Sequence, residues 1–196
     1  MKSYFLPRAM AYIIDIIIVS LICMLLTFWI PSSSKYKEAV ENSQKIQESY
    51  QNGEISVKEY LKQNGEASYD ASRENVIYNV ISVIVTICYF GTYAYYSDGK
   101  TIGKKLAKIK ITSVDGTNPT HMSLILRSVL LYNVIFIFLN IVCCFVVSRS
   151  TYFYYNMGIS AVESLFFLVT IGMMLFRKDG RGLHDLICKT KVICEE

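Results

Sequence analysis

The chain has 196 residues, of which 53% are hydrophobic and only 18% are charged. A soluble domain typically carries about 25% charged residues, so this composition argues against an ordinary soluble protein. The net charge of +4 does not indicate nucleic-acid binding, because the basic residues cluster beside apolar segments, where they act as membrane-orientation signals. We therefore expect a single membrane domain over residues 1–196.

Four apolar stretches are long enough to cross the ~30 Å hydrocarbon core of a membrane, which takes about 20 helical residues. They lie at residues 9–30, 76–97, 123–147 and 157–176. The first run is too long for a secretory signal and is followed by no small-residue cleavage site, so we expect it to remain as a span. The sequence predicts an all-α transmembrane fold, a four-helix membrane bundle.

Basic residues in the loops predict the orientation. Five lysines lie in residues 98–122 and five basic residues follow residue 176, whereas the loop after the third span has only Arg149. By the positive-inside rule, the second loop and both termini are cytoplasmic. We expect a multi-pass protein of the plasma membrane, with the polar loop at 31–75 outside.

That external loop carries apolar residues at helical spacing on both sides of an Asn52-Gly53 turn signal. This pattern predicts two short amphipathic helices that form a small polar cap. The alternative is a mobile, solvated loop.

The second loop predicts a helix followed by a strand. Ile102, Leu106 and Ile109 fall at helical spacing among lysines, which is typical of a basic amphipathic helix at an anionic inner leaflet. The lysines expected at this lipid surface are Lys104, Lys105 and Lys108. Residues 108–112 then alternate like a strand, as do residues 189–193 in the tail, so we expect a small two-stranded cytoplasmic sheet.

Ionisable side chains within the spans require a reason, because a charge at the centre of a membrane helix costs roughly 2.5–3.5 kcal/mol on insertion scales. Arg8 and Asp15 share one helix face, about 10 Å apart, so each is expected to face a group on another helix. Arg127 and Asp185 are expected at the same cytoplasmic depth as Arg8, where the three can form a cluster.

Deeper polar residues predict a track through the bundle. Its expected members are Asp15, Asn133, Asn140 and Glu163. Carboxylate and carbonyl oxygens bind hard cations, and a buried carboxylate holds a proton more tightly than an exposed one. Such a track therefore suits the exchange of a proton for a cation. The alternative is structural, because polar side chains also hold membrane helices together and arginines near a span end extend to the lipid phosphates.

No soluble-enzyme signature is present in the sequence: it has no H-E-x-x-H, no G-x-S-x-G and no Cys/His ligand spacing. We therefore expect no enzymatic activity, no metal site and no cofactor. Most of the six cysteines are expected to be small apolar fillers of helices.

Three features together resemble one known family: Arg8 with Asp15 in the first span, the Gly-Lys-Thr-Ile-Gly-Lys-Lys-Leu run after the second, and Gly-Leu-His-Asp-Leu after the last. This is the RDD family, a bacterial membrane family named for one arginine and two aspartates. The resemblance implies that Arg8, Asp15 and Asp185 are those residues, and that the loop at 31–75 is an insertion. Sodium (or lithium)/proton antiport is ascribed to some members, so the resemblance implies such transport as an expectation.

Two functions are therefore considered. The first is small-cation transport of Na⁺ or Li⁺ coupled to H⁺ within the lipid bilayer, with Asp15 and Glu163 as exchangeable carboxylates. The ion-pair cluster would form an inner gate, and a slender four-helix pathway favours a homo-oligomer. The alternative is a non-transporting binding, accessory or immunity protein that recognises an extracytoplasmic protein through the loop at 31–75.

Overall fold

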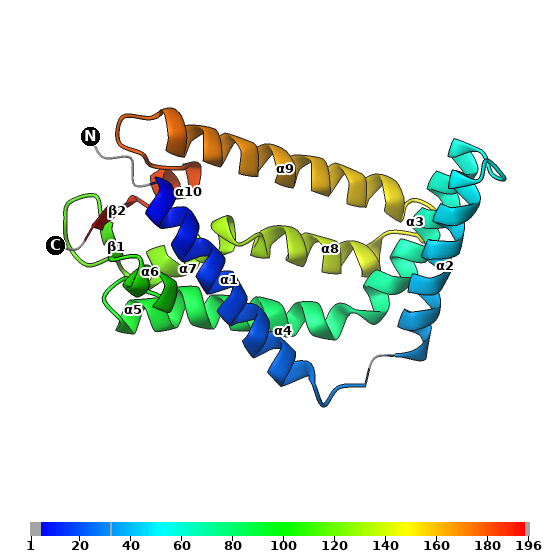
Figure 1. Cartoon of the computed structure of the whole chain (residues 1–196), viewed down its shortest axis with the longest axis horizontal. Helices are drawn as coiled ribbons and strands as arrows, with labels where there is room; N and C mark the ends of the chain where they lie inside the picture. Colours follow the sequence, from blue (N-terminus) through cyan, green and yellow to red (C-terminus); the bar gives the residue numbers. More distant parts are fainter. Residues whose placement is uncertain (1–4, 32, 195–196) are drawn as a thin grey trace. The chain divides into compact units, whose positions relative to one another are not determined.

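The computed structural model describes residues 5–31 and 33–194, which are mainly helical with one small sheet (Figure 1). The chain forms two compact units. The first consists of Met1–Leu26, Ser82–Ile135 and Glu163–Glu196, and the second of Thr27–Ile81 and Phe136–Val162.

Three of the described helices are long and apolar enough to cross a membrane. They are α1 (Phe5–Thr27), the Val76–Tyr96 segment and α9 (Tyr152–Phe176). The Val76–Tyr96 segment consists of α4 (Val76–Ile87), the π-helical turn η1 (Cys88–Tyr93) and α5 (Ala94–Tyr96). The predicted positions of these three spans are confirmed to within a few residues, and α1 begins before Arg8 and so includes it.

The predicted third span is wrong as a continuous helix. It is a bent pair, α7 (His121–Leu131) and α8 (Val134–Val146), whose axes differ by 64°. The break lies at Asn133, whose φ of 60° is left-handed, a conformation that asparagine tolerates better than most residues. Arg127 and Asn140 therefore do not lie on one straight helix, and the described residues do not form four continuous spans.

The predicted two-stranded sheet is confirmed. β1 (Ile109–Ser113) pairs antiparallel with β2 (Thr190–Cys194), and Ile111 lies opposite Val192. Each strand follows a five-residue helix, α6 (Ile102–Leu106) before β1 and α10 (Leu183–Ile187) before β2.

These two segments are copies of one structural unit. Residues 98–111 and 179–192 both begin with Asp-Gly and a basic residue, then form a short helix and a strand of equal lengths. The residues between helix and strand, Lys108 and Lys189, both have a left-handed φ, of 53° and 52°. Ile111 and Val192 are equivalent residues and are paired with each other, so a local two-fold axis passes between the two strands.

The sheet is buried against helices of the first unit. The cluster contains small residues of α1 and α5, apolar residues of both strands, and one leucine of α7, namely Ala11, Ala94, Ile109, Ile111, Val192 and Leu124. Gly103 of α6 lies against α1 so closely that a β-carbon there would be 2.4 Å from the carbonyl oxygen of Ala11. The absence of a side chain thus allows α6 to approach α1.

The second unit contains the loop at 31–75, which forms two helices as predicted. α2 (Ser34–Gln51) and α3 (Val57–Glu74) pack against each other as a hairpin, and Gly53 in the turn has a φ of 75°. Tyr50 stacks on Tyr60 at the turn, with ring centroids 4.7 Å apart. The helices are 18 residues each, longer than the short ones expected, so the mobile-loop alternative does not describe this segment.

Candidate functional site: two buried charge clusters

The first cluster surrounds Asp15, which is fully buried. Tyr89 Oη donates to Asp15 Oδ1 at 2.7 Å, and the backbone N–H of Gly103 donates to the same oxygen at 2.8 Å. Thr101 Oγ1 donates to Oδ2 at 2.5 Å, and Lys104 Nζ lies 3.7 Å from Oδ2. We call these five residues the Asp15 cluster.

Local structure brings these donors to α1. Tyr89 lies in the π-helical turn, a distortion that is often found at functional sites. Thr101 is the N-cap of α6 and its hydroxyl accepts from the N–H of Lys104, which is the usual role of threonine at that position. The first turn of α6 therefore presents a hydroxyl, an N–H and an ammonium group to one carboxylate.

Lys104 is buried, so its prediction as a lipid-surface lysine is wrong. Its Nζ also donates to Thr101 Oγ1 at 3.2 Å and lies 5.5 Å from the centroid of the Phe90 ring. Burial lowers the pKa of Lys104 to about 8, although the charge of Asp15 opposes that shift. The amphipathic helix predicted to extend to Ile109 ends at Leu106, because the chain turns there into β1.

The other two predicted lipid-surface lysines are exposed. Lys105 Nζ donates to Tyr93 Oη at 3.2 Å and lies 5.2 Å from the centroid of its ring, while Lys108 forms the left-handed turn before β1. Their contact with lipid remains a prediction.

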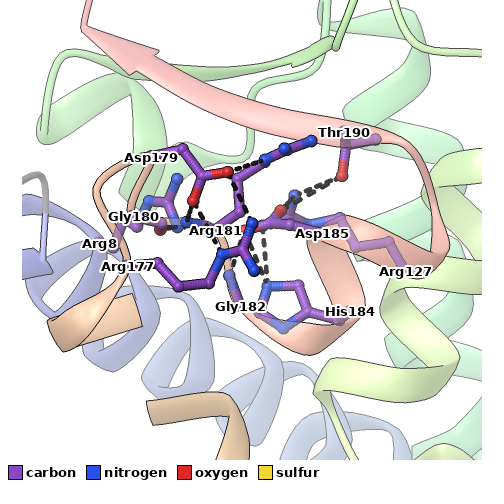
Figure 2. Close-up of polar contacts among 10 residues, drawn as sticks. All are labelled: Arg8, Arg127, Arg177, Asp179, Gly180, Arg181, Gly182, His184, Asp185 and Thr190. Atoms are coloured by element: carbon purple, nitrogen blue, oxygen red, sulfur yellow. Dashed lines mark hydrogen bonds and ion pairs between the residues drawn. The ribbon is translucent and has the colours of Figure 1, made fainter. Parts of the chain in front are cut away.

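The second cluster surrounds Asp185, which is also fully buried (Figure 2). Arg8 Nη1 lies 3.1 Å from Asp185 Oδ2, and Arg127 Nη1 pairs with Oδ1. Thr190 Oγ1 donates to Oδ1 at 3.2 Å. We call Arg8, Arg127, Asp185, Thr190 and His184 the Asp185 cluster. The structure thus brings together the three residues expected at one depth.

The hydrogen bonds around Asp185 hold the two arginines in fixed positions. Arg127 Nη1 also donates to Thr190 Oγ1 at 3.0 Å, and Arg8 Nη1 donates to the carbonyl oxygen of Gly180 at 2.7 Å. Burial alone would raise the pKa of Asp185, but the charges of Arg127 and Arg8 hold it below its usual range. Asp185 is therefore an ionised carboxylate between two guanidinium groups.

His184 completes this cluster as a neutral ring. Burial, followed by the charge of Arg127, lowers the pKa of His184 to about 3. Its Nε2 lies 3.4 Å from Arg127 Nη2. Nε2 also lies 3.5 Å from Asp185 Oδ2, so its two neighbours favour opposite tautomers: the guanidinium favours an acceptor at Nε2, and the carboxylate favours a donor there.

The remaining predicted site residues are not members of these two clusters. Asn140 accepts a hydrogen bond from Asn156 Nδ2 at 3.0 Å in the second unit. Glu163 is partly buried in α9, and no salt bridge involves it among residues 5–31 and 33–194. The hydrogen bonds of Asp15 go to Tyr89 and to the 101–103 segment, and the track of Asp15, Asn133, Asn140 and Glu163 stays a prediction.

A cavity of about 250 Å³ adjoins both clusters. Its walls are mostly apolar side chains of α1, α7, α9 and the sheet, and its polar lining residues include Arg8, Lys104, Arg127, Thr170 and His184. Within the described part of the chain, no group of three His, Cys, Asp or Glu residues is placed to hold a metal ion.

Sequence reasoning predicted both arginine partners of Asp185 but missed the partners of Asp15. Tyr89, Thr101 and Gly103 were not singled out, and Lys104 was assigned to the lipid surface. The available signal was the repeat of residues 98–111 in residues 179–192, since Lys104 and Asp185 occupy equivalent positions in it. A site residue established in one copy would have indicated the equivalent residue of the other copy as a candidate.

Comparison with known families supports the resemblance seen in the motifs. The model of the RDD family matches residues 3–189, nearly the whole chain. No curated protein matches the chain, and no solved structure matches it.

Proposed function

We propose, from the premise that the chain belongs to the RDD family, that it is an integral membrane protein that exchanges a small cation for a proton at the Asp15–Lys104 pair. The observation that carries this proposal is the buried ammonium of Lys104, 3.7 Å from an equally buried carboxylate. In this proposal both termini and the sheet lie on the cytoplasmic side.

The pair suits exchange because its two charges are interdependent. While Lys104 is protonated, its ammonium neutralises Asp15. When Lys104 releases its proton, Asp15 is left with no cationic partner but with the hydroxyl oxygens of Tyr89 and Thr101 beside it. Na⁺ and Li⁺ are hard cations, like those for which carboxylate and other oxygen ligands are the preferred partners. One proton leaves and one cation enters, so the charge at the site is conserved.

The pKa of Lys104, about 8, places this release near neutrality. Below pH 8 the ammonium form dominates and competes with the cation, whereas above pH 8 the neutral amine dominates. Cation binding at Asp15 is therefore expected to strengthen as pH rises through 8. The Asp185 cluster is proposed as an ion-pair gate next to the exchange site, and Glu163 as a second exchangeable carboxylate.

The test is transport in vesicles that contain a pH-sensitive dye. Purified full-length protein is reconstituted, Na⁺, Li⁺ or K⁺ salts are added outside, and the lumenal pH is followed. We expect Na⁺ or Li⁺ to evoke proton movement that Lys104→Gln and Asp15→Asn abolish. Lys105→Gln is the matched control, because it removes the adjacent but exposed lysine. Proton movement that survives Asp15→Asn, or its absence from correctly folded wild-type protein, would refute the proposal.

The α2–α3 hairpin favours a second candidate function. Its helices pack on each other through a hydrogen bond from Ser43 Oγ to Asn64 Oδ1 at 2.7 Å and through the Tyr50–Tyr60 stack. A helical hairpin of this size suits recognition of an extracytoplasmic protein by an accessory or immunity protein. Replacing residues 35–72 with a short linker separates the candidates: transport at Asp15 should survive the replacement, whereas a binding function should not.

A further inference from the structure

The cavity beside the two clusters contains three buried polar atoms that have no partner among the described residues. They are Arg8 Nε, Thr170 Oγ1 and His184 Nδ1, and all three belong to residues that line the cavity. Each of these residues is more than nine-tenths buried. Buried polar atoms in proteins are nearly always hydrogen-bonded, so unpartnered atoms in three lining residues indicate a ligand. Arg8 Nε only donates, so this ligand has a hydrogen-bond acceptor.

The charges around the cavity indicate the sign of that ligand. The two clusters contain three cations, Arg8, Lys104 and Arg127, and two carboxylates, Asp15 and Asp185. His184 is neutral, so one positive charge is left without a counter-ion. Buried charges are normally paired, and the unbalanced cation therefore favours an anion.

The walls of the cavity indicate that the ligand is also apolar. Residues of α1 and α9 supply much of the lining, namely Phe5, Ala9, Tyr12, Ile13, Phe167 and Ile171. Ile13 and Phe167 are 58% and 40% exposed, so the lining continues onto the outer surfaces of these two apolar helices. In a membrane those surfaces face acyl chains, which gives a lipid direct access to the cavity.

We propose that this cavity binds an anionic phospholipid from the bilayer, with part of one acyl chain between α1 and α9 and the phosphate at Arg8 and Thr170. Basic pockets between membrane helices are known to accept anionic headgroups. A volume of about 250 Å³ is below the usual range of about 300–1,000 Å³ for pockets that enclose a whole drug-sized molecule. It therefore suits a chain segment and a phosphate group, and the rest of the lipid stays in the bilayer.

The same contacts select against a zwitterionic lipid. Both carboxylates of the clusters are already paired with cations of the protein, so neither is available as a counter-charge for the quaternary ammonium of phosphatidylcholine. A free phosphate ion would satisfy the cation but would leave the apolar walls empty. This proposal does not require cation exchange, because the two residues proposed to contact the phosphate, Arg8 and Thr170, lie outside the Asp15 cluster.

The test is lipid retention by the purified full-length protein, measured by native mass spectrometry. The probes are phosphatidylglycerol and phosphatidylcholine with identical dioleoyl chains, and inorganic phosphate alone. Ala9→Phe fills the cavity without changing its charge. Ala161→Phe is the matched control, since it makes the same exchange at an exposed position of α9 outside the lining.

We expect the wild type to retain one phosphatidylglycerol per chain, with a preference over phosphatidylcholine of about tenfold, as a charge-assisted contact provides. Ala9→Phe should remove this preference and Ala161→Phe should keep it. If Ala9→Phe does not fold, Thr170→Val decides, because it keeps the volume and removes the hydroxyl proposed to contact the phosphate, so it should weaken phosphatidylglycerol retention. Equal retention of the two lipids, binding of inorganic phosphate alone, or no effect of a folded Ala9→Phe or Thr170→Val variant would overturn the proposal.

Discussion

Lys104 and Asp185 occupy equivalent positions in the two copies of one structural unit and carry opposite charges. Each is the third residue of its five-residue helix, α6 or α10. Both side chains are buried and both form ion pairs with α1, Lys104 with Asp15 and Asp185 with Arg8. The repeat thus contacts α1 twice. The first copy supplies the cation of the ion pair, and the second copy supplies the anion.

This arrangement explains why α1 tolerates two charges. Arg8 and Asp15 lie on one face, and the equivalent positions of the repeat supply the opposite charge to each. Removing one partner of a buried ion pair leaves a buried charge uncompensated, which is strongly destabilising, whereas removing both is often close to neutral. The two pairs can therefore be tested by substitutions made singly and together.

The Asp15–Lys104 pair should behave as a coupled unit. Asp15→Asn should destabilise the protein by about 3–5 kcal/mol, because it leaves the buried ammonium of Lys104 without a counter-charge. Adding Lys104→Met should restore much of that loss, since methionine fills similar space without charge. The measurement is the thermal unfolding midpoint of the purified protein for both single variants and the double variant. Strictly additive effects would show that the two side chains do not interact.

Stability should depend on the pH through Lys104. Its pKa in the folded protein, about 8, is below the ordinary value of about 10.4, so between these values the unfolded chain binds more protons. Stability is therefore expected to increase as pH rises from about 8 to about 10.4, by up to about 3 kcal/mol for this group.

Other groups also titrate in that range, so the informative quantity is the difference between wild type and Lys104→Met. Unfolding midpoints are measured from pH 7 to pH 10.5 for both proteins. The wild type should gain stability relative to the variant as pH rises. A constant difference across this range would mean that Lys104 has an ordinary pKa and is not buried as described.

The membrane spans were predictable because a bilayer of fixed thickness requires apolar runs of fixed length. Depth in the membrane likewise predicted the meeting of Arg8, Arg127 and Asp185. The break at Asn133 was not predictable from periodicity, because one left-handed residue leaves the apolar pattern on both sides unchanged. Because the break lies at Asn133, between Arg127 in α7 and Asn140 in α8, these asparagines do not extend the helix face of Arg127.

Lys104 shows a second limit of sequence patterns. Lysines beside an apolar helical stripe are most often exposed, and Lys104 and Lys105 are adjacent in that pattern. Their different environments arise from Gly103, which lets the first turn of α6 approach α1, and from Asp15, which binds that turn. Both are tertiary contacts between distant segments, and spacing within one segment does not contain them.

Asp185 should be more important for folding than its exposed neighbour Asp179. Asp185→Asn leaves two buried guanidinium groups with a neutral partner, so we expect a loss of about 3–5 kcal/mol and a lower unfolding midpoint. Asp179 binds Arg177 and Arg181 at the surface (Figure 2), where ion pairs contribute little. Asp179→Asn is therefore the matched control and should leave the midpoint nearly unchanged. Similar midpoints for the two variants would contradict the burial of Asp185.

Gly103 should not accept a side chain without loss of the Asp15 cluster. A β-carbon there would lie 2.4 Å from the carbonyl oxygen of Ala11 and 2.8 Å from the carboxyl group of Asp15, so Gly103→Ala must move α6 away from α1. This displacement would lengthen the N–H contact to Asp15 and separate Lys104 from it.

Gly158 provides the control for that substitution, because a β-carbon at this position of α9 meets open space. Gly158→Ala should be neutral or slightly stabilising, since alanine is favoured over glycine in a helix by about 1 kcal/mol. Gly103→Ala should lower the unfolding midpoint and abolish cation-evoked proton movement in vesicles. If Gly103→Ala keeps both, α6 can shift without loss of function, and the contact between its first turn and Asp15 is not what holds the exchange pair together.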